Sequence, residues 1–228
     1  MFRHPEENDG FCHGTLLTER HVLTTAICTE TIVLNETIAV LGEYERNRDL
    51  DCDSNGNCTD PIMELTIGNY IAHPGFKGSS FEYDIALVVL NANVTYSNSI
   101  QPICLPLTPI IASSVHIPVQ YDVLWPEEGA LPKQIPMKYV PHAICEKFTA
   151  NLLILHEGQI CAKYERQMAA RLMNGSGSPL LVEFHDRIFQ LGILSIGLAN
   201  ATYRDPYVYV NITTHANWIH NTILNDMQ

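Results

Sequence analysis

The sequence predicts an all-β fold, either a barrel or a sandwich, that ends in one helix. Apolar residues come in short runs rich in Val, Ile, Thr, Tyr and Leu, and clusters of Gly, Pro, Asn and Asp separate them. Both features are typical of strands joined by turns. The expected strand-forming runs are Thr15–Ile27, Thr31–Leu41, Met63–Ile71, Ile85–Leu90, Ile117–Leu124, Gly192–Ile196 and Tyr207–Ile212.

The final helix is expected over about residues 214–225. Helical spacing places Trp218, Ile219, Thr222 and Ile223 on one face, and a Thr is the expected N-cap. The Pro-rich stretch Gln101–Pro109 is a plausible connection between two halves of the chain.

Composition bounds the class of protein. The chain has 228 residues, of which 46% are hydrophobic, enough for a sizeable core in one large or two small domains. With 13 Lys+Arg against 25 Asp+Glu, the net charge is −12, which argues against binding nucleic acid through its phosphates. No apolar run approaches the ~20 residues that span a bilayer, so we expect no membrane span.

Seven cysteines suggest three local disulfides and one thiol left over. The short spacings favour pairs 12/28, 52/58 and 145/161, which leave Cys104. Seven reduced thiols in a cytosolic protein are the alternative. Six N-x-S/T sequons favour a secreted glycoprotein; they begin at Asn35, Asn57, Asn93, Asn174, Asn200 and Asn211.

The first residues, Met1–Glu7, are polar and do not form a signal peptide. We therefore expect that an N-terminal part of a longer precursor is missing; a wrongly recorded start is the alternative.

Four ordered blocks resemble the trypsin-like serine proteases, which have the chymotrypsin fold. They are Phe11–Cys28, Asp84–Leu87, Asn174–Leu180, and Leu191–Gly197 followed by Tyr207–Val210. The resemblance runs from Phe11 to the chain end. It implies two packed, antiparallel, six-stranded β-barrels, the first over about residues 1–105 and the second over about 106–213, in one domain spanning 1–228.

Further blocks resemble the clip-domain proteases of arthropods. They are Leu41–Tyr44, Asp51–Pro61, Ile71–Pro74 and Ile103–Pro106. The resemblance implies that Cys104 bonds to an N-terminal light chain or clip domain outside this chain. A buried free cysteine is the alternative.

The resemblance assigns two retained triad positions and one lost position. Ser176 stands at the nucleophile position and Asp84 at the carboxylate position, but Ile27 stands where the catalytic histidine belongs. Without a base, a serine hydroxyl stays protonated and is a poor nucleophile.

Other histidines are expected to be surface or core residues. His21 lies ~20 Å from position 27 along a strand. The remaining candidates fall in blocks whose geometry does not approach the serine; they are His13, His73, His185 and His215.

The substrate site also departs from the family. In the oxyanion loop, Asn174 replaces a glycine and Gly175 replaces the aspartate that receives the new N-terminal amine after zymogen cleavage. Ala170 stands at the pocket floor without charge, and Leu172 replaces a disulfide cysteine. The family tryptophan that lines the cleft is replaced, and the ring of Tyr207 is expected to fill the pocket; the pocket positions are Ala170, Ile196, Gly197 and Tyr207.

Calcium is the one cofactor considered. Asp51–Gly56 matches the first half of an EF-hand loop, but its twelfth position is Ile62. The resemblance leaves Glu43 as a weak calcium ligand candidate. A solvated turn held by Cys52 and Cys58 is the preferred interpretation.

These features predict a secreted, non-catalytic serine protease homologue. The resemblance implies a binding cofactor or regulator in an extracellular cascade, of the kind that drives melanisation and antimicrobial signalling, with proteases or zymogens as partners. Two alternatives are an active trypsin-like endopeptidase with an unusual base and a truncated, nonfunctional product.

Overall fold

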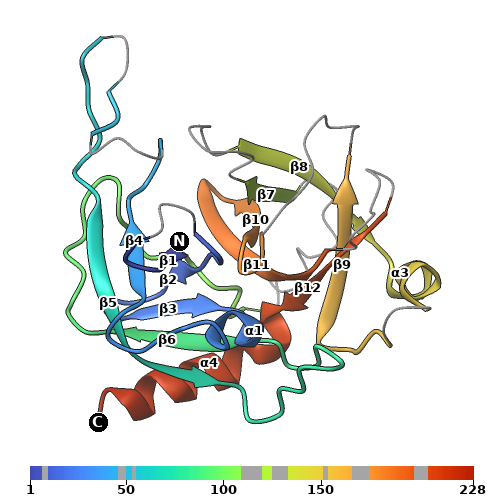
Figure 1. The fold of residues 1–228 in the computed structure, drawn as a ribbon. Helices are drawn as coiled ribbons and strands as arrows, with labels where there is room; N and C mark the ends of the chain where they lie inside the picture. Colours follow the sequence, from blue (N-terminus) through green and yellow to red (C-terminus); the bar gives the residue numbers. More distant parts are fainter. Residues whose placement is uncertain are drawn as a thin grey trace.

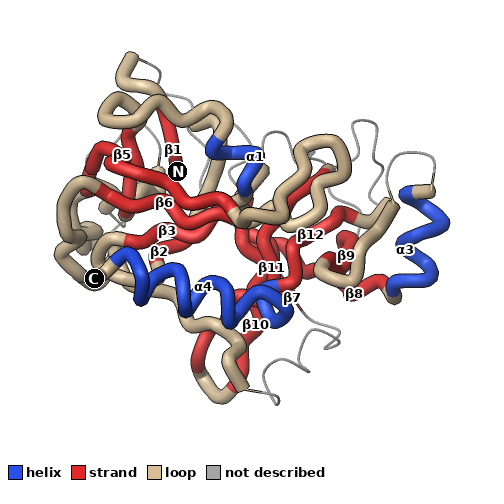
Figure 2. The backbone as a smooth tube through the Cα atoms, turned by 90° about the horizontal axis from the view of Figure 1, so that it is seen from below, coloured by secondary structure: helices blue, strands red, loops and turns tan. Residues whose placement is uncertain are grey.

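The chain folds into two β-sheet units that pack side by side, with a C-terminal helix running beneath both (Figures 1 and 2). This computed structural model describes residues 1–6, 10–45, 50–52, 55–108, 120–124, 133–150, 154–165, 175–197 and 205–228.

The first unit is a six-stranded antiparallel sheet in the order β1-β4-β5-β6-β3-β2. Its two edges meet because the Phe2 N–H donates to the Cys12 carbonyl and the Phe11 N–H donates to the Phe2 carbonyl, both at 2.9 Å. The curled sheet encloses an apolar core that includes Phe2, Ile67 and Leu90. The strands are β1 (Phe2–Arg3), β2 (Thr15–Leu16), β3 (His21–Thr24), β4 (Ile38–Leu41), β5 (Met63–Ala72) and β6 (Ala86–Leu90).

The second unit is a closed barrel in the order β10-β11-β12-β9-β8-β7. The expectation of two six-stranded antiparallel barrels is confirmed. The sequence runs missed β1 in the first unit and β8, β9 and β10 in the second. The strands are β7 (Gln120–Leu124), β8 (Lys133–Val140), β9 (Gln159–Tyr164), β10 (Pro179–Phe184), β11 (Arg187–Ile196) and β12 (Tyr207–Asn211).

Two short helices, α1 (Ala26–Thr29) and α3 (His142–Thr149), were not expected from the sequence. Helix α3 follows Pro141 and is joined to β9 by the disulfide between Cys145 and Cys161. The buried residues of α3 are Cys145 and Thr149, whereas Ile144 and Phe148, which are one turn apart, are exposed.

The long helix α4 (Ile212–Asp226) begins two residues before the expected start. Its cap is Asn211 and not a threonine, because the Asn211 side-chain oxygen accepts a 3.0 Å hydrogen bond from the Thr213 N–H. Ile212, His215 and Ile219 form its buried face.

A shared apolar cluster holds the two barrels and α4 together. Leu23, Ile85 and Leu87 come from the first barrel or the loop before β6. Ile193 and Val210 come from the second barrel, and Ile212 and Ile219 from α4. Across the same junction, the Thr15 hydroxyl donates to the Gln190 side chain at 2.6 Å.

The three expected disulfides are present, joining Cys12 to Cys28, Cys52 to Cys58, and Cys145 to Cys161. Cys104 is half-buried and its thiol is free. Its backbone carbonyl accepts a 3.0 Å hydrogen bond from the Gln190 N–H. A bond from Cys104 to another chain stays a prediction. None of the described helices is long and apolar enough to cross a membrane.

The end of α4 is tied to the first barrel through His21, whose ring nitrogen lies 3.0 Å from an Asp226 carboxylate oxygen. We expect Asp226→Ala to lower the free energy of unfolding by about 1 kcal/mol, because a largely buried imidazole loses its partner. Denaturant unfolding measures this. The matched control is Asn225→Ala, one position earlier and exposed; an equal loss in both variants would contradict the role of the pair.

The sequon at Asn211 is expected to remain unmodified in a secreted preparation. The Asn211 side-chain oxygen accepts from both the N–H and the hydroxyl of Thr213, at 3.0 and 2.7 Å, and the residue is buried. Glycopeptide mass spectrometry of protein from insect cells should find sugar at Asn35, Asn57 or Asn93, but not at Asn211. A glycan at Asn211 would contradict the prediction.

Candidate functional site

The centre of the candidate site is Asp84, which lies between β5 and β6 and is 0% exposed. One carboxylate oxygen accepts a 2.8 Å hydrogen bond from the Ile27 backbone N–H of α1. The other accepts a 2.5 Å hydrogen bond from the Ser195 hydroxyl of β11. The carboxylate is therefore held by groups from both barrels.

Burial is the main influence on the charge of this carboxyl group. Desolvation raises the pKa of Asp84 to about 6, although the hydrogen bonds from Ser195 and Ile27 act in the opposite direction. The residue whose backbone contacts the carboxylate is Ile27, and its half-buried side chain carries no titratable atom. The carboxylate therefore has no imidazole at this position to orient.

Ser176 precedes β10 in a tight backbone turn at the junction of the barrels. Its carbonyl accepts a 2.8 Å hydrogen bond from the His13 N–H, and the next N–H, of Gly177, donates to the Leu194 carbonyl at 2.9 Å. Gly177 has a φ of +89°, and a Cβ there would lie 1.9 Å from the His13 carbonyl oxygen, so only glycine fits. Because Leu194 is adjacent to Ser195, this turn lies close to the cradle of Asp84, by which we mean the two hydrogen bonds from Ile27 and Ser195.

The block that contains His13 was not expected to approach the serine, and the hydrogen bond between the His13 N–H and the Ser176 carbonyl corrects this expectation. The His13 backbone lies directly against Ser176, its carbonyl accepts a 2.7 Å hydrogen bond from the Thr24 hydroxyl, and only 7% of the residue is exposed. The Ser176 hydroxyl itself makes no hydrogen bond to any residue that the structure describes. His13 therefore contacts the serine through its backbone.

The other histidines occupy separate places. His21 pairs with Asp226, and His185 lies in the turn between β10 and β11. The rings of His73 and His215 meet edge to face at 5.7 Å in an aromatic cluster with Tyr83 and Trp218.

Tyr207 of β12, the residue that is expected to fill the substrate pocket, is only 4% exposed. Its ring lies 5.3 Å from the Tyr164 ring, and a Cβ at Gly197 would lie 3.4 Å from it. The ring therefore lies in the second-barrel core and packs against Gly197. Ile196 is half-buried and packs against the cluster that contains Val208.

Part of the predicted site lies outside the described residues, namely Ala170, Leu172, Asn174 and the sequon at Asn200. Gly175 is described and buried, and its carbonyl accepts a 2.9 Å hydrogen bond from the Ser178 N–H.

Ser195 is the site residue that sequence reasoning missed. The only signal for it was one hydroxyl within an otherwise apolar strand, in the block Leu191–Gly197. Its role depends on Asp84, 111 positions earlier, and only the folded chain shows the pair.

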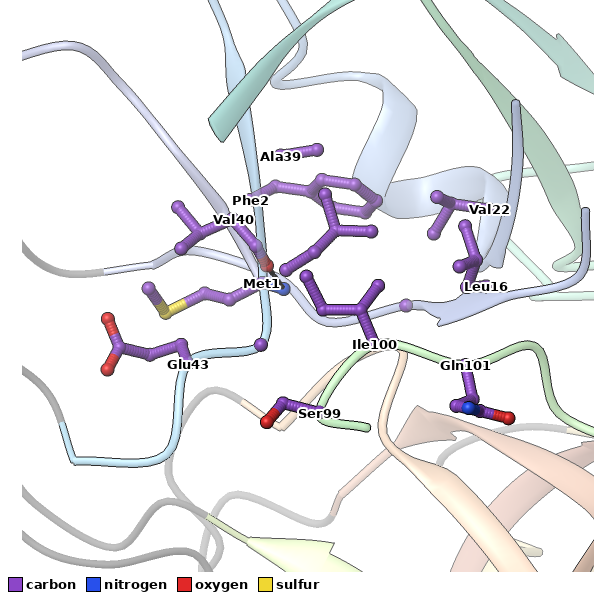
Figure 3. Close-up of a pocket in the computed structure, with 13 residues that line it drawn as sticks. Met1, Phe2, Leu16, Val22, Ala39, Val40, Glu43, Ser99, Ile100 and Gln101 are labelled. Atoms are coloured by element: carbon purple, nitrogen blue, oxygen red, sulfur yellow. Dashed lines mark hydrogen bonds between the residues drawn. The ribbon is translucent and has the colours of Figure 1, made fainter. Parts of the chain in front are cut away.

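A separate apolar pocket of about 180 Å³ lies in the first barrel, and Figure 3 shows Phe2, Val22 and Ile100 around it. Glu43, the weak calcium candidate, lies at its edge. Within the described ranges, no three His, Cys, Asp or Glu side chains are grouped to hold a metal ion. Calcium binding at Glu43 therefore remains an untested prediction.

Two packed β-barrels, with a buried aspartate and a serine turn at their junction, define the fold of the trypsin-like serine proteases. The sequence profile of the family described as Trypsin matches residues 3–219. The chain therefore belongs to the trypsin family.

Its relatives include clip-domain proteases of insects. The chain is 29% identical to CLIP domain-containing serine protease B9 of Anopheles gambiae, over 93% of this chain and 55% of that protein. It is 30% identical to the phenoloxidase-activating enzyme of Bombyx mori, over 93% of this chain and 54% of that protein. The chain thus spans little more than half the length of these relatives.

The crystal structure of the Drosophila Grass clip serine protease of the Toll pathway has the same fold. It superposes with a TM-score of 0.83 over 98% of this chain and 68% of that chain, at 24% sequence identity. The expected family and fold are therefore confirmed.

The buried carboxyl group predicts a pH dependence of stability with a defined sign. Because the pKa of Asp84 is raised from 3.8 to about 6 on folding, the folded chain binds this proton more tightly than the unfolded chain. The contribution of Asp84 to stability is therefore greatest below pH 4 and falls as the pH rises to 6, by roughly 3 kcal/mol at most.

Asp84→Asn should remove this slope and raise the free energy of unfolding above pH 6, since an amide oxygen can still accept from the Ile27 N–H. Denaturant unfolding from pH 4 to 8 compares the variant with the wild type. Parallel pH profiles for the two proteins would contradict the raised pKa.

Proposed function

We propose that this chain is a non-catalytic serine protease homologue that acts by binding. The observation that carries the proposal is the residue whose backbone N–H contacts Asp84: it is Ile27, at the position that the family pattern gives to the catalytic base. The carboxylate and the serine are retained, but the group that would transfer a proton between serine and substrate is absent from this position.

The chemical argument concerns the whole triad. A serine hydroxyl attacks a carbonyl only when a base removes its proton, and members of a triad act as a unit. Ile27 cannot accept a proton, and the Ser176 hydroxyl has no hydrogen-bond partner among the described residues. Asp84 therefore has no imidazole at position 27 through which it could help to activate the serine.

The pocket and the activation switch support the same proposal. Tyr207 is buried against Gly197, where an open pocket would need space for a substrate side chain. Gly175 has no carboxylate to pair with an N-terminal amine after zymogen cleavage. Restoring a histidine would leave both of these departures in place.

The proposed role is that of a secreted cofactor or regulator in an extracellular proteolytic cascade. Three disulfides favour an oxidising compartment. Relatives include proteins named phenoloxidase-activating enzyme and phenoloxidase-activating factor 3, which supports a cascade of that type. We propose proteases or zymogens of such a cascade as partners, and a clip-containing light chain as the partner of Cys104.

An active endopeptidase with a displaced base is the competing function, and it rests on the retained Asp84 and Ser176. A panel of chromogenic peptides together with a serine-directed phosphonate probe separates the two. We expect neither turnover nor labelling of Ser176. Labelling at Ser176 accompanied by turnover would overturn the non-catalytic proposal.

Ile27→His alone is expected to restore little activity, with a kcat/KM about a thousandfold below that of a trypsin-family enzyme. The reason is that Tyr207 and Gly175 still alter the pocket and the activation switch. Ile27→His with Ser176→Ala is the control for contaminating protease. Serine-dependent, trypsin-like turnover from the single substitution would show that only the histidine had been lost.

A further inference from the structure

A second pocket lies between the two barrels, outside the candidate catalytic cleft, and has a volume of about 230 Å³. One wall comes from the loop that precedes Asp84, the opposite wall from the turn before β9, and the floor from the first turn of α4. The polar side chains that line it are Glu82, Tyr83, His156, Glu157, Gln159 and His215.

The walls are held in place by hydrogen bonds and ring contacts. The Gln159 side-chain amide donates to the Phe81 carbonyl at 3.1 Å, which ties the two loops together across the pocket. The same side chain accepts from the His156 N–H at 2.9 Å. The Tyr83 ring stacks on His73 at 4.6 Å. The pocket is therefore built into the barrel junction.

The charge of the pocket is negative. One Glu82 oxygen lies 3.3 Å from the Lys77 ammonium, and the other lies 3.8 Å from a ring nitrogen of His156. Glu157 is exposed at the pocket and has no charged partner among the described residues. The pocket lining thus carries two carboxylates, of which only Glu82 is paired with an ammonium group.

The histidines favour a ligand that can share hydrogen bonds and stack. Burial lowers the pKa of His215 and of His73, so both are neutral at neutral pH and do not repel a cation. The Nε2 atom of His156 is buried without a hydrogen-bond partner. The pocket therefore offers carboxylates and aromatic ring surface.

We propose that this pocket binds an arginine side chain of a partner protein. A guanidinium group is planar, donates several hydrogen bonds in a fixed geometry, and packs well on aromatic rings, which suits carboxylates beside Tyr83. A metal ion is disfavoured, since no three metal-binding side chains are grouped in the described chain. The inference does not depend on whether Ser176 is catalytic.

The first experiment measures binding of N-acetyl-arginine amide to the full chain by NMR chemical shift titration. We expect shifts of the Gly158 and Gln159 amides with weak, saturable binding. N-acetyl-citrulline amide has nearly the same shape without the charge and should bind about tenfold more weakly. N-acetyl-lysine amide tests whether the planar group is required. Equal affinity for the citrulline and arginine compounds would overturn the proposal.

Two substitutions, one expected to weaken arginine-amide binding and one expected to strengthen it, test whether binding takes place in this pocket. Glu157→Gln should weaken arginine-amide binding about tenfold, because it removes the carboxylate at the pocket mouth. Lys77→Met should strengthen binding several-fold, because it removes the cation that competes for Glu82. Glu183→Gln, an exposed site on β10, is the matched control. Unchanged affinity in both pocket variants would show that arginine binds elsewhere, and would overturn the proposal.

Discussion

The burial of Asp84 at the point where the two barrels meet is the constraint that links the fold to the candidate site. Burying an ionisable group costs free energy unless hydrogen bonds compensate it. Asp84 receives one hydrogen bond from Ile27 of α1 and one from Ser195 of β11. The raised pKa shows that this compensation is incomplete. Both barrels must be in place for the cradle to form, so the candidate cleft and the barrel interface are parts of one arrangement.

The cradle also explains how the fold tolerates an isoleucine at position 27. The hydrogen bond that this residue supplies to Asp84 comes from its backbone N–H and not from its side chain. Any residue other than proline can supply it. The hydrogen bond to Asp84 can therefore form with many different side chains at position 27, because it uses a backbone atom of that residue.

The loop before Asp84 contributes both to the barrel interface and to the wall of the acidic pocket lined by Glu82 and Glu157. Phe81 and Tyr83 have φ angles of +53° and +55°, which bulky residues rarely adopt. This backbone turns the Phe81 carbonyl toward Gln159 and places Tyr83 against His73. The conformation that presents Asp84 to the interface thus also builds one wall of the acidic pocket. A ligand in that pocket would contact residues of both barrels.

Sequence patterns were sufficient for the scaffold. Short β-prone runs, cysteine spacing and four ordered blocks predicted two barrels, three disulfides and the family. These features are local, or they repeat at fixed intervals along the chain. Helix α3 was missed because a disulfide cysteine and Thr149 form its buried face, while its apolar residues Ile144 and Phe148 are exposed. The helix cap was misplaced because both Asn211 and the threonines that follow it are good capping residues.

The composition of the site was decided by contacts between distant residues. Ser195 meets Asp84 across 111 positions, His13 lies against the serine turn, and Gln159 of the second barrel reaches the Phe81 carbonyl of the first. No periodicity or motif encodes such pairs. The sequence by itself determined the fold, the family and the absence of a base at position 27. Only the tertiary structure decided which side chains share the junction, because the packing of one barrel on the other sets those distances.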